Sequence, residues 1–145
     1  MSAETESFHG TWRFNAQLSN MCAPAPHSWI QKISAGPDEV EVREEIVRLN
    51  GTGLVVRVRA RFDGVDYPVE GSPSVDTIAY TRADQYAICG IGKKGGKVAL
   101  TQTVLADPEK RTLTIVYNYL IGERAVAYGI AVFEAVEFEQ ALTAA

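Results

Sequence analysis

The chain of 145 residues is long enough for one domain and too short for two domains of ordinary size. Hydrophobic residues make up 46% of it and charged residues 22%, which is typical of a globular protein and excludes a disordered chain. The 14 basic and 18 acidic side chains give a net charge of −4, which argues against nucleic acid as a partner. We expect a single domain over residues 1–145, with tails at 1–7 and 136–145.

Three features bear on where the protein works. No apolar stretch approaches the roughly 20 residues that span a bilayer, so we expect no membrane contact. The polar, acidic residues 1–7 are unlike an export signal. Cys22 and Cys89 match neither a disulfide framework nor a metal-ligand spacing. Together these features predict a reducing, cytoplasmic setting.

Hydrophobic and polar residues alternate along most of the chain, and a period of two is typical of β-strands with one buried face. Val56 and Val58, for example, alternate with Arg57 and Arg59. Turn signals such as Asp63-Gly64 separate these runs at near-regular intervals. In chain order the pattern predicts strands near residues 8–15, 28–35, 39–49, 53–62, 75–82, 85–92, 97–106, 111–121 and 125–135.

Short connections predict that strands adjacent in sequence pair antiparallel. Such strands most simply close into an up-and-down β-barrel, because closure removes exposed edges. A sandwich of two sheets is the alternative. In the last strand, small residues such as Gly129 alternate with larger ones such as Tyr128, and we expect the larger set to face the interior. After Phe133 we expect a short helix or a frayed tail.

Three segments resemble a known family. The chain has Gly10-Thr11-Trp12 near its start, a proline-rich loop at residues 21–28, and an Asp-Gly-x-Asp-Tyr-Pro stretch at residues 63–68. Over nearly the whole domain the chain resembles a small bacterial lipocalin-like family with a calycin-type barrel. The resemblance implies an all-β, antiparallel, lipocalin-like barrel of about 8–10 strands. It also implies a small apolar ligand and a structural role for Trp12 at the closed end, but no catalytic residue.

Glu44 is the main candidate for chemistry. By strand parity it shares a face with Val40, Val42 and Ile46, which predicts that it points to the interior. A carboxyl group in an apolar cavity has a raised pKa and suits general acid–base catalysis. A β-bulge at Glu44-Glu45 would instead turn Glu44 to solvent, and the sequence leaves both interpretations open.

The same parity places several aromatic and amide side chains on interior faces. An apolar cavity with a few convergent polar groups is the usual composition of a ligand pocket, and a buried phenol needs a hydrogen-bond partner. A solid core is the alternative, since barrels of this size do either. The predicted ligand-binding residues are Trp29, Gln31, Tyr80, Tyr86, Gln102, Tyr119 and Tyr128, with His27 on the pocket rim.

Motifs for phosphate binding, serine hydrolysis and zinc binding are absent, so we expect no metal and no cofactor. The first hypothesis is a barrel, monomeric or homodimeric, that binds a small hydrophobic or aromatic molecule. The second is a cofactor-free lyase, isomerase or cyclase in the same cavity, in which Glu44 moves a proton and Tyr117 stabilises negative charge. The third is an interaction barrel with a filled core.

Overall fold

The structure is a computed structural model, and it describes residues 7–136. This part of the chain consists of β-strands, their connections and one short 3-10 helix, η2 (Ala16–Leu18). No helix within residues 7–136 has the length and apolar character needed to cross a membrane. The strands are β1 (Gly10–Phe14), β2 (Asn20–Met21), β3 (Ser28–Ala35), β4 (Glu39–Val47), β5 (Gly53–Arg61), β6 (Tyr67–Glu70), β7 (Thr77–Asp84), β8 (Ala87–Lys94), β9 (Lys97–Asp107), β10 (Thr112–Ile121) and β11 (Arg124–Ala135).

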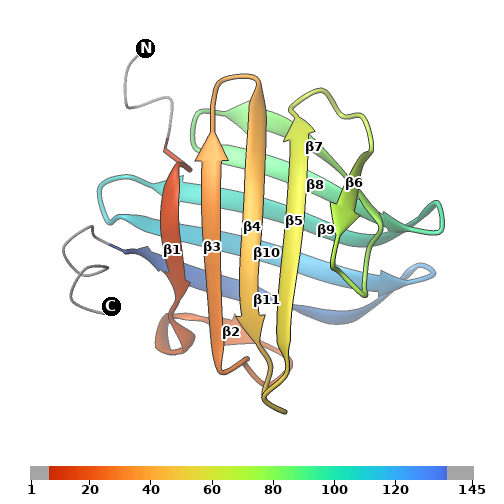
Figure 1. The fold of residues 1–145 in the computed structure, drawn as a ribbon, viewed down its shortest axis with the longest axis horizontal. Coiled ribbons are helices and arrows are strands. Elements are labelled where there is room, and N and C mark those ends of the chain that lie inside the picture. Colours follow the sequence, from red (N-terminus) through yellow and green to blue (C-terminus); the bar gives the residue numbers. More distant parts are fainter. Residues whose placement is uncertain (1–6, 137–145) are drawn as a thin grey trace.

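The strands form one closed antiparallel barrel. From β3 to β11 each strand pairs with the next, and β1 pairs with both β3 and β11, which closes a ring of ten strands. The remaining strand, β2, pairs only with β11, beside the point where β1 leaves it. In Figure 1, β1, β3, β4 and β5 stand upright in front of strands that cross behind them. The predicted up-and-down barrel is confirmed, and a single closed sheet excludes the sandwich.

Alternating side chains build the interior. In β5, Val56 and Val58 are buried, whereas Val55 and the arginines on the other face are exposed. Trp12 has a structural role: it is buried, and its indole N–H donates a hydrogen bond to the carbonyl oxygen of Phe8 (3.0 Å). This bond fixes the segment before β1 to the barrel.

Two short strands were not predicted. β2 has only two residues, and β6 has four with Pro68 among them, so neither shows the alternation of a longer strand. At the other end, β11 continues past Phe133 to Ala135. The predicted C-terminal helix or tail lies at residues outside the described part of the chain, as do most of the residues in the two predicted tails.

The interior face of β11 is the opposite of the predicted one. Its small residues point into the barrel, and its larger ones, with Tyr128 55% exposed, point outward. The register with β10 gives the reason, since Tyr117 lies opposite Gly129 and Tyr119 opposite Ala127. Each inward tyrosine of β10 thus has a small neighbour in β11. The prediction that Tyr128 faces the interior is wrong because the space is already taken by tyrosines from β10.

Candidate ligand-binding cavity

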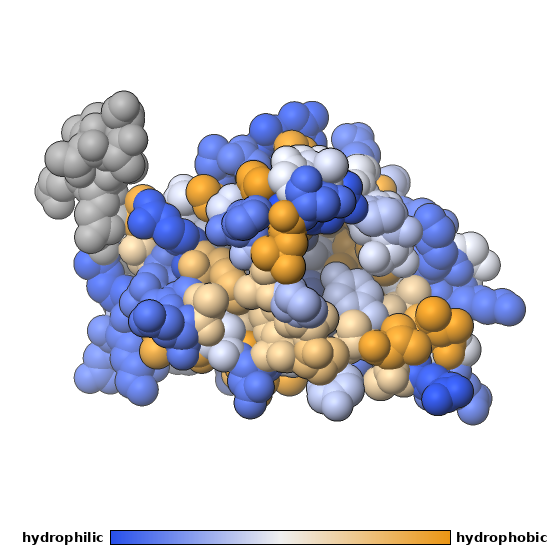
Figure 2. All heavy atoms as spheres, turned by 90° about the horizontal axis from the view of Figure 1, so that it is seen from below, coloured by the Kyte–Doolittle hydropathy of each residue, from blue (hydrophilic) through white to orange (hydrophobic). Residues whose placement is uncertain are grey.

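The barrel encloses a cavity of about 670 Å³. Its rim is formed by residues near 24–26, 48–50 and 72–75, so it opens at the end of the β4–β5 hairpin. Figure 2 looks at this end and shows hydrophobic residues around a hollow near its centre. A cavity of this volume suits a drug-sized organic molecule. The strand residues that line it are Trp29, Gln31, Glu44, Ile46, Leu54, Val56, Val58, Val69, Ile78, Tyr80, Leu100, Gln102, Ile115, Tyr117 and Tyr119.

Strand register gathers four polar residues deep in the cavity. Gln31 of β3 lies opposite Glu44 of β4. On the other wall, Tyr80 of β7 and Gln102 of β9 both lie opposite Gly90 of β8. These four polar residues, here called the polar belt, also line a smaller void of about 40 Å³. Apart from the belt, that void is lined by apolar residues, so the belt separates the main cavity from the core beneath it.

Glu44 lies inside the barrel because β4 passes it without a register shift against either neighbour. The indole N–H of Trp29 donates to Oε1 of Glu44 (2.8 Å), and the amide of Gln31 donates to the same oxygen (3.1 Å). Oε2 has no hydrogen bond within residues 7–136. Burial raises the pKa of the carboxyl group above its usual range, and the bond from Trp29 lowers it by less. Glu44 therefore holds a proton to higher pH than an exposed glutamate does.

The negative charge of Glu44 affects the pKa of two phenols in the cavity wall, Tyr80 and Tyr119. Burial first, and then the negative charge of Glu44, raise the pKa of Tyr80, which is 5% exposed. The same causes, followed by Tyr117, raise the pKa of Tyr119 to about 12. Neither hydroxyl has a hydrogen-bond partner in the described part of the chain. Hydroxyl groups inside proteins almost always have a hydrogen-bond partner. Since these two have none from the described residues, each can bond a bound molecule or a water.

Tyr117 lies in a different environment. Its ring packs on that of Tyr119 at a centroid distance of 5.7 Å. Its hydroxyl oxygen, however, is only 2.9 Å from where a Cβ atom on Gly129 would lie. Burial, followed by the Cys22 thiol, raises the pKa of Tyr117. Of these three phenols, Tyr80 and Tyr119 have a pKa that the charge of Glu44 raises, whereas Tyr117 lines the same cavity and its predicted role beside Glu44 stays a prediction.

Glycines in β8 make room for the polar belt. A Cβ atom on Gly90 would lie 3.1 Å from the ring of Tyr80 and 3.1 Å from Cγ of Gln102. A Cβ atom on Gly92 would lie 2.8 Å from Cγ1 of Val75 at the rim. No role in a site was predicted for these glycines. Glycine inside a strand marks a close approach of neighbours, and this signal could have identified both positions.

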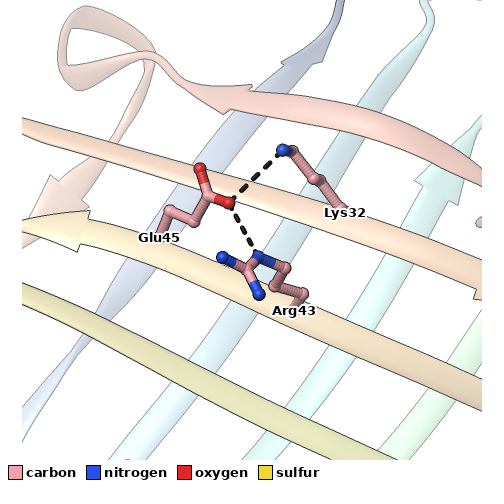
Figure 3. Close-up of polar contacts among 3 residues, drawn as sticks. All are labelled: Lys32, Arg43 and Glu45. Carbon is pink, nitrogen blue, oxygen red and sulfur yellow. Dashed lines mark hydrogen bonds and ion pairs between the residues drawn. The ribbon is translucent and has the colours of Figure 1, made fainter.

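The outer face of the same sheet is charged. Glu45 points outward and accepts hydrogen bonds from Nε of Arg43 (2.8 Å) and Nζ of Lys32 (3.3 Å), as Figure 3 shows. These two bonds hold the pKa of Glu45 below its usual range. A hollow of about 670 Å³ lies on this outer surface, and its lining includes the charged side chains of Lys32, Glu41, Arg43, Arg57, Arg59 and Glu70. It has none of the enclosing aromatic residues of the interior cavity.

Three of the predicted ligand-binding residues do not line the cavity. Tyr128 lies on the outer face of β11, as described above. Tyr86 sits in the β7–β8 turn, where Oδ1 of Asp84 accepts its backbone N–H (2.7 Å), so strand parity does not apply and its side chain is exposed. His27 is exposed beside the rim, where its backbone N–H donates to the carbonyl oxygen of Val47 (2.8 Å).

The sequence predicted one rim residue, His27, and did not identify the side chains that line the opening. Arg48, the neighbouring Leu49 and the prolines of the 22–27 loop line the opening. Loop residues carry no alternation, so strand parity says nothing about which of them reach the cavity. Only the positions of the hairpin and loop in the barrel bring them together.

No group of three or more His, Cys, Asp or Glu side chains within residues 7–136 is placed to hold a metal ion. Comparison of the chain with known protein families, with curated proteins and with solved structures gives no significant match. The chain is therefore characterised by its fold and cavity: a closed antiparallel β-barrel with a large interior hollow.

Proposed function

We propose that this protein is a lipocalin-like barrel that binds a small, mostly apolar organic molecule in its interior. The observation that carries the proposal is the cavity of about 670 Å³, which has the polar belt at its depth, mainly apolar and aromatic side chains on its walls, and polar residues again at its rim. Apolar walls supply affinity by removing ligand surface from water. The polar belt supplies orientation, since its unbonded groups can meet only a few positions on a ligand.

Unused hydrogen-bonding groups of the polar belt and of the nearby cavity residue Tyr119 support this proposal. Oε2 of Glu44 and the hydroxyls of Tyr80 and Tyr119 have no partners within the described residues. The side-chain amide of Gln102 has none there either. A polar ligand group placed among them would satisfy several at once, whereas an empty cavity would have to fill with water.

Native mass spectrometry of protein purified from its own host, with a thermal-shift screen of small aromatic and polyketide-like compounds, tests the proposal. We expect a co-purifying mass, or an unfolding temperature that rises with ligand concentration as linkage requires. If no mass is found and no compound shifts the unfolding temperature, the barrel is not a small-molecule carrier.

A second candidate function is catalysis by a cofactor-free lyase, isomerase or cyclase in the same cavity. The unbonded Oε2 of Glu44, together with the raised pKa of that carboxyl group, favours it. In this mechanism Glu44 takes a proton from the bound substrate or gives one to it. The hydroxyls of Tyr80 and Tyr119 donate hydrogen bonds to the oxygen on which negative charge develops.

Substitution of Glu44 separates the two functions. In the catalytic case, Glu44→Gln lowers turnover by about 10²-fold or more, because the proton-transfer group is lost. The ligand affinity of this variant changes far less than its turnover, since the amide oxygen of the new glutamine can still accept the hydrogen bonds from Trp29 and Gln31. Glu45→Gln is the matched control and leaves turnover unchanged. Equal turnover of all three proteins would exclude Glu44 as the acid or base.

A further inference from the structure

The cavity is asymmetric in charge. Among the described residues that line it, Glu44 is the only acid and Arg48 the only base. Glu44 lies deep in the barrel, in the polar belt. Arg48 is exposed at the rim, and its Nε atom donates a hydrogen bond to Oγ1 of Thr52 (3.0 Å). The depth of the cavity therefore contains a carboxyl group with no basic side chain beside it.

The hydrogen bonds of Glu44 leave it without a charged partner. Trp29 and Gln31, which donate to Oε1, are both neutral, and Oε2 has no donor within residues 7–136. Its neighbour Glu45, in contrast, has two cations on one oxygen. A carboxylate taken out of water without a counter-ion is costly, and an unpaired one gains most from a cation that arrives with a ligand.

Aromatic rings surround this position. Trp29, Tyr80, Tyr117 and Tyr119 come from three strands, β3, β7 and β10, and all line the same cavity. The face of an aromatic ring carries partial negative charge and attracts ammonium groups. Acidic oxygen and aromatic faces thus favour the same kind of ligand group, and a carboxylate ligand would be repelled by Glu44.

We propose that the cavity selects an apolar molecule that carries a protonated amine, with the ammonium group bound at Oε2 of Glu44 and the apolar body directed toward the rim. This inference rests on the proposed ligand-binding function and specifies the ligand class. The ammonium N–H groups donate to Glu44 and to the amide oxygen of Gln102. The remainder of the molecule contacts the apolar side chains above the belt.

Three compounds of similar shape test the charge preference: 2-naphthylethylamine, 2-naphthylethanol and 2-naphthylacetic acid. Isothermal titration at neutral pH with the wild-type chain measures each affinity. We expect the amine to bind about tenfold tighter than the alcohol, because a charge-assisted hydrogen bond is stronger than a neutral one. We expect the acid to bind most weakly. Equal affinities of amine and alcohol, or tighter binding of the acid, would overturn the inference.

Two variants test whether Glu44 causes the preference for the amine. Glu44→Gln should weaken binding of the amine more than binding of the alcohol, so that the two affinities become similar, whereas the matched control Glu45→Gln should keep the wild-type preference. An unchanged preference in Glu44→Gln contradicts the assignment. If Glu44→Gln does not fold, the ratio of the affinities of the wild-type chain for the amine and for the alcohol still tests the inference.

Failure of this inference can be told apart from failure of the proposed function. If the thermal-shift screen finds ligands and none gains affinity from an amine, the charge preference is wrong and the carrier function stands. If no compound of any charge binds, the carrier function fails, and the charge preference fails with it.

Discussion

Glu44 and Glu45 are neighbours in one strand, yet their surroundings are opposite. Glu44 faces the cavity and accepts bonds from two neutral side chains, and burial raises its pKa. Glu45 faces solvent and accepts bonds from Arg43 and Lys32, which lower its pKa. Successive side chains of a strand point to opposite faces, so one step along β4 changes the environment completely.

The adjacent strand, β5, has an uncharged pair of neighbours with the same difference in exposure. Val56 is 7% exposed and lies opposite Glu44, and Val55 is 41% exposed and lies opposite Glu45. The two pairs show that the face on which a residue lies, rather than its type, decides whether it can contribute to a site. They also provide matched substitutions, in which the same change is made inside and outside the barrel.

The largest effect is expected from filling the cavity. Val56→Phe places a larger side chain beside Glu44 and should weaken ligand binding by at least about tenfold, because it occupies space that the ligand needs. Val55→Phe, on the outer face, should leave binding unchanged. Titration calorimetry with a ligand found in the screen measures both, and circular dichroism checks the fold. Equal binding by both variants would show that the ligand site is elsewhere.

A smaller but clear effect is expected on stability from Gly90→Ala. The new Cβ atom would crowd both Tyr80 and Gln102, so the free energy of unfolding should fall by about 1–3 kcal/mol. Gly53→Ala is the control, since a Cβ atom there meets nothing within 4 Å. Urea unfolding of both variants measures the difference. A Gly90→Ala protein as stable as wild type would mean that the belt can rearrange freely.

The pH dependence of stability should distinguish the two faces. A raised folded-state pKa at Glu44 means that the native state binds a proton more tightly than the unfolded chain. The contribution of Glu44 is thus fully present below the unfolded value near 4.5 and is lost as pH rises through the folded-state pKa. Urea titrations from acid to neutral pH should show wild type losing stability relative to Glu44→Gln. A constant difference across this range would contradict the raised pKa.

The smallest effect is expected for Glu45→Gln. Exposed ion pairs contribute little, so the free energy of unfolding at neutral pH should fall by less than about 1 kcal/mol, and added salt should reduce the difference. The sign of the pH dependence is opposite to that of Glu44. Because its folded-state pKa is lowered, the contribution of Glu45 is present above the unfolded value and is lost as pH falls. A large loss of unfolding free energy that added salt does not reduce would mean that Glu45, Arg43 and Lys32 form part of the core.

The interior residues of β3, β4, β5 and β10 were predictable from alternation. Parity placed Gln31 and Tyr80 on interior faces and left Glu44 open between the interior and a β-bulge, and the structure puts all three in the polar belt. In β3, β4 and β5 the prediction worked because these strands pair in a continuous register, so side chains keep alternating between the two faces along their length.

Prediction failed where hydrophobicity was taken to indicate the inward direction. Tyr128 has a large aromatic side chain and Gly129 has none, yet Gly129 faces inward because Tyr117 from the adjacent strand needs the space. Tyr86 was counted as part of a strand, and it belongs to a turn held by Asp84. Neither error could be seen from one strand, since both depend on a neighbour.

The sequence by itself determined the class of fold, because alternation, short connections and turn residues act locally and all favour an antiparallel barrel. The tertiary structure alone decided that the interior is hollow and which groups meet in it. Closure of the ring sets the cavity volume, and cross-strand register places Gln31 against Glu44 and Tyr80 and Gln102 beside Gly90. These are relations between residues distant in the chain, and no local pattern contains them.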